Sequence, residues 1–123
     1  MEKKVSIIPF IADHLIELVH ISAREALDRE VNGPAFTAVD EDGDIVACAG
    51  VYKIGPGVGY AWVVPGKKME RHGLWVTRTI KLFLNDIKRG LKLERIEALV
   101  PDKKNVRWIK MLGFKSDETR FVI

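Results

Sequence analysis

A chain of 123 residues suits one compact domain and is too short for two, so we expect a single domain over residues 1–123. Hydrophobic residues make up 47% of the sequence and charged residues 30%, which excludes an intrinsically disordered chain. The apolar runs fall far short of the roughly 20 residues that cross a bilayer, and no signal-type stretch develops, so we expect a cytoplasmic protein without membrane association. The net charge of +3 fits a ligand with several phosphates as well as it fits nucleic acid.

Hydrophobic periodicity divides the chain into alternating strands and helices. Breaks rich in glycine and proline, such as Asn32-Gly33-Pro34, separate them. In chain order we predict a strand over 3–9, a helix over 12–26, a hairpin of strands 35–39 and 45–52, a nearly continuous apolar strand over 58–64, a long amphipathic helix over 69–89, a strand over 95–100, a short helix over 105–112 and a final strand from Phe114 onward, strongest over 119–123. This order favours one mixed α/β sheet with helices on both faces.

The cysteine and histidine content argues against a metal site. Cys48 is the single cysteine, which excludes a site of paired thiolates, and its alternating apolar surroundings indicate a buried structural thiol. The histidines lack the spacing of shared metal ligands, and we expect His14 and His20 on an exposed helix face. We therefore expect no bound metal.

The most informative junction lies between the strand over 58–64 and the long helix. Pro65-Gly66 ends the strand, and Lys67, Lys68 and Arg71 add positive charge before the helix. Unpaired backbone N–H groups at a helix N-terminus, together with the helix dipole, can bind phosphate. The junction is a candidate phosphate site, although an ordinary turn with solvated lysines explains the same residues.

A second informative stretch, residues 102–114, carries a short amphipathic helix led by Asn105 that closes on Leu112-Gly113-Phe114. This ending resembles the last part of the fold of the GNAT superfamily of N-acetyltransferases, and the order of elements matches that fold over essentially the whole chain. Within the superfamily the chain is most similar to small acetyltransferase-like proteins of phages and prophages, which would place it in the host cell cytoplasm. The residues that carry this closer similarity are Arg24, Asp28-Arg29-Glu30, Trp62, Met69-Glu70-Arg71-His72 and Arg107-Trp108.

The resemblance implies both a fold and a reaction. The fold is an α/β (α+β) mixed sheet with helices on both faces, in which the fourth and fifth strands splay apart beside the cofactor. The reaction is acetyl transfer from acetyl-coenzyme A (acetyl-CoA) to an unidentified amine by direct attack, with a backbone N–H near Val63 polarising the thioester. The implied cofactor-binding residues are Val63, Val64, Lys67, Lys68, Arg71, His72, Gly73, Leu74, Asn105 and Trp108.

On the acceptor side, the resemblance implies that Asp28 and Glu30 bind the substrate. Glu30 and Tyr60 are the candidates for catalytic proton transfer, with His72 or a bound water as alternatives for the acid. A solvated helix end explains the two carboxylates as simply, and a core aromatic is the favoured role of Tyr60. The expected partner is a small-molecule or protein amine, nucleic acid is not favoured, and a homodimer stays open.

The sequence departs from the family's pattern at two places. In the pyrophosphate motif, aligned with residues 68–73, Lys68 stands for the usual arginine and Arg71 replaces the middle glycine, so only Gly73 remains. Ile109 occupies the position where many GNAT enzymes carry a tyrosine that reprotonates coenzyme A. These departures leave open a catalytically inactive GNAT-fold binding module or virion-associated phage protein. A nucleic-acid-associated role, suggested by the basic balance, is a third and less favoured interpretation.

Overall fold

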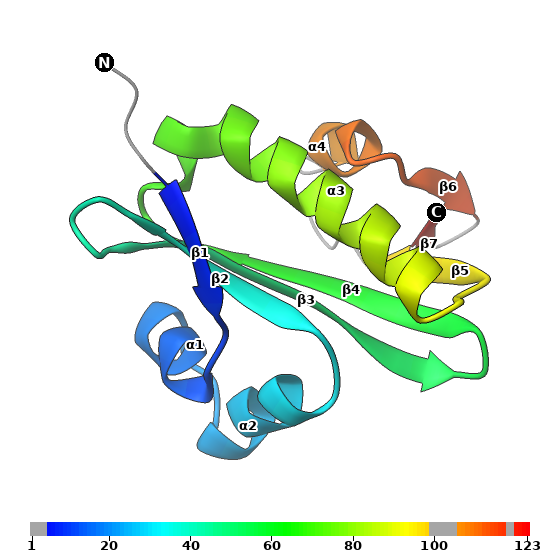
Figure 1. Cartoon of the computed structure of the whole chain (residues 1–123), viewed down its shortest axis with the longest axis horizontal. Helices are drawn as coiled ribbons and strands as arrows, with labels where there is room; N and C mark the ends of the chain where they lie inside the picture. Colours follow the sequence, from blue (N-terminus) through cyan, green and yellow to red (C-terminus); the bar gives the residue numbers. More distant parts are fainter. Residues whose placement is uncertain (1–4, 99–105, 118–119) are drawn as a thin grey trace.

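The computed structural model describes residues 5–98, 106–117 and 120–123. Within them, one mixed sheet has seven strands in the order β1-β2-β3-β4-β5-β7-β6 (Figure 1). The elements are β1 (Val5–Pro9), α1 (Ala12–Leu18), α2 (Ala23–Val31), β2 (Ala35–Asp40), β3 (Ile45–Gly55), β4 (Val58–Pro65), the 3-10 helix η1 (Met69–His72), α3 (Gly73–Gly90), β5 (Arg95–Ala98), α4 (Val106–Met111), β6 (Lys115–Asp117) and β7 (Arg120–Val122).

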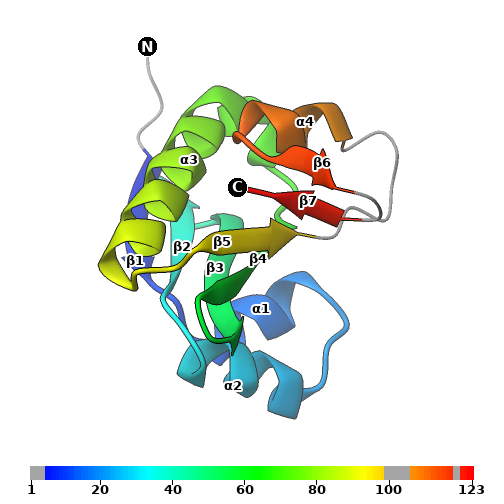
Figure 2. The same cartoon turned by 90° about the vertical axis from the view of Figure 1, so that its right-hand side faces the viewer.

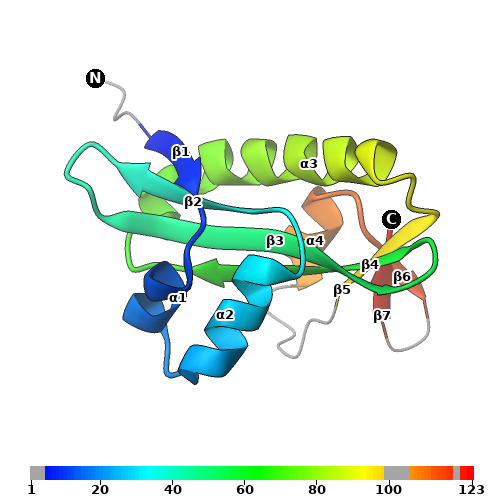
Figure 3. The same ribbon diagram turned by 60° about the horizontal axis from the view of Figure 1, so that its bottom comes forward.

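Helices cover both faces of the sheet, which confirms the expected fold class. α1 and α2 lie on one face and α3 and α4 on the other, as Figure 2 and Figure 3 show from two sides. Successive side chains of a strand point to opposite faces, so in β4 Ala61 joins the core under α3 while Trp62 joins the core under α1 and α2. The buried Ile80 and Leu15 anchor these two cores, each contributing about 1.5–3 kcal/mol of hydrophobic free energy.

The prediction of one helix over 12–26 is wrong, because the chain forms two helices there. Val19 is extended, with φ −141° and ψ 159°, and ends α1. Ser22 then caps α2, since its Oγ accepts the backbone N–H of Glu25 at 3.1 Å. The serine cap satisfies a backbone donor that a continuous helix would have bonded within the helix, so it favours the break.

The second half of the chain departs from the predicted boundaries in two ways. The long helix begins with the 3-10 turn η1, and α3 then runs to Gly90 as expected. The predicted final strand is two strands, because β6 and β7 pair antiparallel. Gly113 adopts φ 105°, which confirms that it closes α4 in the left-handed region. Residues 3, 4, 99, 100, 105, 118 and 119 of the predicted elements lie outside the described residues.

The parallel ladder between β4 and β5 is short. They run parallel and pair over three residue pairs, from Val58 with Arg95 to Tyr60 with Glu97. On its other side β4 stays paired with β3 as far as Pro65. Among the described residues, 61–65 have no strand partner on the β5 side, as expected for a β4–β5 pair that splays apart, and residues 99–105, which follow β5, lie outside the described residues.

Within the part of the chain that the structure describes, no helix combines the length and the apolar character that a membrane span requires.

Candidate functional site

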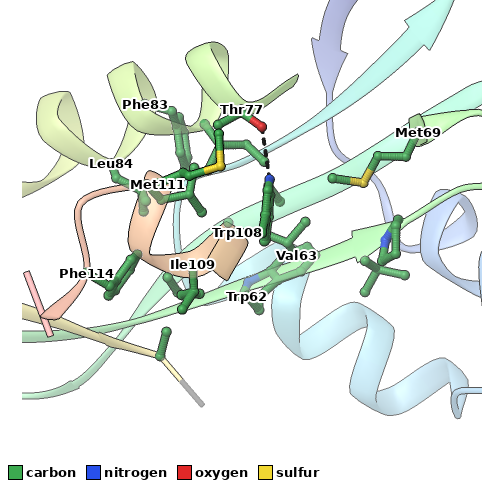
Figure 4. Close-up of a pocket in the computed structure, with 18 of the residues that line it drawn as sticks. Trp62, Val63, Met69, Thr77, Phe83, Leu84, Trp108, Ile109, Met111 and Phe114 are labelled. Carbon is green, nitrogen blue, oxygen red and sulfur yellow. Dashed lines mark hydrogen bonds between the residues drawn. The ribbon is translucent and has the colours of Figure 1, made fainter. Parts of the chain in front are cut away.

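A cleft with a volume of about 1100 Å³ opens where β4 and β5 stop pairing. Small-molecule sites in proteins are typically about 300–1,000 Å³, so this cleft has room for a large ligand. β4, the start of α3 and α4 supply its walls, with Trp62 and Val63 below and Trp108 across from them (Figure 4). Successive residues of a strand point their backbone N–H and C=O groups to opposite neighbours, so alternate residues within 61–65 turn these groups to this edge, where the described residues provide no strand partner.

The turn that follows β4 is held close to β3. The Gly66 N–H donates to the Val46 carbonyl at 2.8 Å, and a Cβ at Gly66 would collide with the carbonyl oxygen of Ile45. Only glycine fits this close approach. Within η1 the N–H groups of Met69 and Arg71 donate to the carbonyls of Gly66 and Lys68, so these two donors are already used.

The N-terminus of α3 carries features that favour an anion. No side chain caps it, its first turn has no acidic residue, and the helix is 18 residues long. Among the described side chains, none therefore compensates the positive end of the helix dipole from within this first turn. Gly73 and Leu74 in this first turn line the cleft, and a Cβ at Gly73 would meet open space.

A short chain of hydrogen bonds links α4 to the first turn of α3. The Trp108 indole N–H donates to Thr77 Oγ1 at 2.9 Å (Figure 4). The Thr77 hydroxyl in turn donates to the Gly73 carbonyl at 2.7 Å. Ile109, at the position of the family's tyrosine, is buried. The wall opposite β4 is thus fixed by the indole and offers no hydroxyl at Ile109.

Lys68 points to the β2–β3 hairpin. Its Nζ lies 2.6 Å from Asp44 Oδ2, 2.9 Å from Asp40 Oδ2 and 3.5 Å from Asp42 Oδ2. The hydrogen bond from Lys68 lowers the pKa of Asp40, although burial opposes this, and the bonds to Asp44 and Asp40 raise the pKa of Lys68. The carboxylates lie close enough together to share a cation, and the Lys68 ammonium supplies that charge. Sequence spacing does not reveal this contact, because the hairpin and the turn are distant in the chain.

The structure brings part of the predicted cofactor set together. The predicted residues that line the cleft are Val63, Val64, Lys67, Gly73, Leu74 and Trp108. Those that do not line it are Lys68, Arg71 and His72, of which Arg71 is exposed and His72 is buried. Asn105 lies outside the described residues.

The α1/α2 side of the cleft is built around Trp62. Its ring packs edge-on against Phe10, with centroids 5.2 Å apart, and the guanidinium carbon of Arg29 lies 4.9 Å from its centroid. Arg29 and Trp62 both line the cleft. Sequence reasoning placed no site role on Arg29, because the contact joins a helix to a strand far along the chain.

The predicted acceptor carboxylates lie away from the cleft. Both Asp28 and Glu30 are exposed, and neither lines it. Glu30 Oε1 accepts the backbone N–H of Ala12 at 2.6 Å, which ties α2 to the start of α1. Glu30 therefore stabilises the helix pair in this structure.

Tyr60 lines the cleft and is half-buried, with its ring tilted against Tyr52 at a centroid distance of 5.2 Å. Glu97 lies opposite Tyr60 in the β4–β5 register, and it is buried. Glu97 Oε2 is 3.3 Å from Nε of Arg95. The sequence analysis missed this carboxylate because it sits inside an otherwise apolar strand, and its acidic type at a buried position was the available signal.

The expectation of an exposed His14 is wrong, whereas His20 is exposed. His14 is half-buried because its Nδ1 lies 2.8 Å from the hydroxyl of the buried Thr37 and accepts the Ile11 N–H at 3.3 Å. Thr37 also lies 3.6 Å from Cys48 Sγ. Cys48 is fully buried as expected, and burial raises the pKa of its thiol. This group of side chains fastens α1 to the sheet.

Solved structures share this fold over most of the chain, whereas no family model and no curated protein matches the sequence. The spermidine/spermine N-acetyltransferase SpeG from Vibrio cholerae superposes with a TM-score of 0.73 and 12% identity, covering 97% of this chain and 91% of that chain. A GNAT-family acetyltransferase from Bacillus anthracis gives a TM-score of 0.65 and 14% identity, covering 82% of this chain and 71% of that chain. At such identities the likeness concerns the fold, and the chain has the GNAT fold.

Proposed function

We propose that the protein is an N-acetyltransferase that uses acetyl-CoA as co-substrate and acetylates an amine. The observation that carries the proposal is the cleft beside β4, which opens after β4 and β5 have paired over three residue pairs and where residues 61–65 have no β5-side strand partner among the described residues. The structural neighbours include a spermidine/spermine N-acetyltransferase by name, which supports an amine acceptor.

The cleft fits the two chemical parts of coenzyme A. Its middle is apolar, with Ala61, Val63 and Trp108 among its walls, and this suits a pantetheine arm whose amides bond to the open edge of β4. At one end, Lys67 and the uncapped start of α3 suit a diphosphate. Lys68, Arg71 and His72 stay predicted contacts, although the Lys68 ammonium is held by the hairpin aspartates.

Bound acetyl-CoA would supply an acetyl thioester, which a neutral amine attacks at the carbonyl carbon as the carbon–sulfur bond breaks. The residues of this chain must take a proton from the amine and return one to the sulfur. Tyr60 is the proposed donor, because it lines the cleft at the last residue of β4 that pairs with β5 and its side chain carries a hydroxyl. Glu97, which lies beside Tyr60 in the sheet, and the predicted Glu30 are the candidate bases, and because neither lines the cleft, each would act through a bound water.

Isothermal titration calorimetry with acetyl-CoA tests the binding half of the proposal. Replacing Lys67 by glutamate should weaken binding about tenfold, the equivalent of about 1.4 kcal/mol. The matched control is Lys81→Glu, which reverses an exposed charge on α3 away from the cleft. Unchanged binding in Lys67→Glu, or equal weakening in both variants, would remove the proposed contact.

Mass spectrometry of an amine and peptide mixture incubated with acetyl-CoA tests the catalytic half. Acetylated products that disappear in a Tyr60→Phe variant support the proposed acid. Binding without any product would instead support a catalytically inactive GNAT-fold protein. The single-domain extent, the cytoplasmic location, the phage or prophage relationship and the homodimer stay predictions.

A further inference from the structure

Arg29 has no part in the acetyl-CoA contacts proposed above. Its side chain lines the cleft on the α1/α2 side of the sheet, with its guanidinium carbon over the Trp62 ring. Contacts of this kind hold arginine in place by about 0.5–2 kcal/mol. A guanidinium that rests on an aromatic face can still donate from the N–H groups around its edge.

The carboxylates that neighbour Arg29 in sequence do not neutralise it. Glu30 accepts the Ala12 N–H, and Asp28 is exposed and does not line the cleft. Over the ranges 5–98, 106–117 and 120–123, none of the salt bridges includes Arg29. Among the described residues, the Arg29 guanidinium therefore has no carboxylate partner, and its side chain lines the cleft with its charge available to a ligand.

The cleft carries positive charge at two separate places. Of the described residues that line it, Arg29 and Lys67 are the charged ones, and no carboxylate is among them. Lys67 follows β4 at the turn before α3, whereas Arg29 comes from α2 on the opposite face of the sheet. A polycation that enters beside Arg29 meets a like charge, while a carboxylate or phosphate meets a preorganised fork of donors.

We infer that the acceptor is a small amine that also carries a carboxylate or phosphate group, which Arg29 binds while the amine points into the splay. This inference rests on the proposed function, because it names the acceptor class of the same cleft. Both oxyanions take the same bidentate hydrogen bonds from a guanidinium, so the geometry defines the shared chemistry.

The test measures binding of glutamate, phosphoethanolamine and spermidine to the full chain, with and without coenzyme A. The Trp62 indole signal in proton–nitrogen NMR spectra, assigned with a Trp62→Phe variant, reports contact at Arg29. We expect an anionic amine to bind at least tenfold more tightly than spermidine. The tighter of glutamate and phosphoethanolamine identifies the anionic group.

Three variants assign the effect to the guanidinium. Arg29→Gln should weaken binding of the anionic amine about tenfold or more, and Arg29→Lys should retain part of it, since the charge stays but the planar fork is lost. Arg24→Gln, an exposed position on the same helix that does not line the cleft, should bind as the unaltered chain does. Thermal unfolding of each variant checks that α2 stays folded.

The inference is overturned if spermidine binds as tightly as the anionic amines, if neither anionic amine binds at millimolar concentration, or if Arg29→Gln leaves their affinity unchanged. It is also overturned if Arg29→Gln weakens acetyl-CoA instead, because Arg29 would then serve the co-substrate. A chain that binds anionic amines through Arg29 but never binds acetyl-CoA would contradict the proposed function and support the anion site by itself.

Discussion

The two faces of β4 present different chemistry to one cleft. On the α3 side the cleft is lined mostly by apolar side chains, among them Val63, Phe83 and Trp108, and ends at the uncapped start of α3 beside Lys67. On the α1/α2 side it is lined by the Trp62 ring and the Arg29 guanidinium. The first face offers a ligand backbone groups and an apolar surface, both of which come with the fold. The second offers it the charge of one side chain, Arg29. In the proposed function, the co-substrate depends on the first face and the choice of acceptor on the second.

The largest expected effect comes from removing the ring that supports the second face. Trp62→Ala should lower the free energy of unfolding by about 3–5 kcal/mol, because a buried aromatic side chain leaves a cavity against Phe10. Urea unfolding followed by circular dichroism measures this. Trp75→Ala, at a half-buried position of α3, is the control and should cost less. An equal cost would mean that the α1/α2 face does not depend on this ring.

A smaller effect is expected at the wall of the first face. Trp108→Phe removes the indole N–H but leaves the Thr77 hydroxyl bonded to the Gly73 carbonyl. Loss of this hydrogen bond should cost about 0.5–1.5 kcal/mol. In a double-mutant cycle with Thr77→Val, the two substitutions should cost less together than the sum of the single losses. Strict additivity would show that the indole and the hydroxyl contribute separately.

The smallest effect is confined to acidic solution and concerns the hairpin that holds Lys68 away from the cleft. The pKa of Asp40 is lowered when the chain is folded, so its contribution to stability is present above the unfolded value of about 3.9 and is lost as the pH falls towards the folded pKa. Asp40→Asn should therefore flatten the acid limb of a stability–pH curve measured by urea unfolding. Asp86→Asn, which alters an exposed pair with Arg89, should leave it unchanged. Parallel acid limbs for Asp40→Asn and the unaltered chain would contradict the ion-pair explanation.

Most of the strands, although not the division of the last one into β6 and β7, follow from the sequence because apolar patterning is a local property. The hairpin of β2 and β3 and the central β4 lie within a few residues of their predicted bounds. The helix over 12–26 failed because Ser22 forms a competing cap, and periodicity does not register a hydrogen bond of one side chain. The prediction for Gly113 is confirmed because a glycine directly after a helix commonly adopts the positive φ that ends it.

The sequence predicts the residues of the candidate site that the order of strands and helices places there. It does not predict those whose position depends on contacts between residues far apart in the chain. Val63 and Lys67 line the cleft because β4 and the following turn occupy the expected place. Lys68, unlike its neighbour Lys67, does not line the cleft, because three aspartates of the β2–β3 hairpin bind its ammonium. Arg29 was missed for the same reason, since its contact with Trp62 exists only after α2 packs on the sheet.

The short β4–β5 ladder gives a central strand the properties of a sheet border. Unpaired borders normally attract other extended chains, and proteins protect them by covering them. Here Trp108 and Ile109 of α4 line the cleft beside this border of β4 (Figure 4). A slender ligand with amides of its own could complete the ladder from inside, as an added strand does at an outer border.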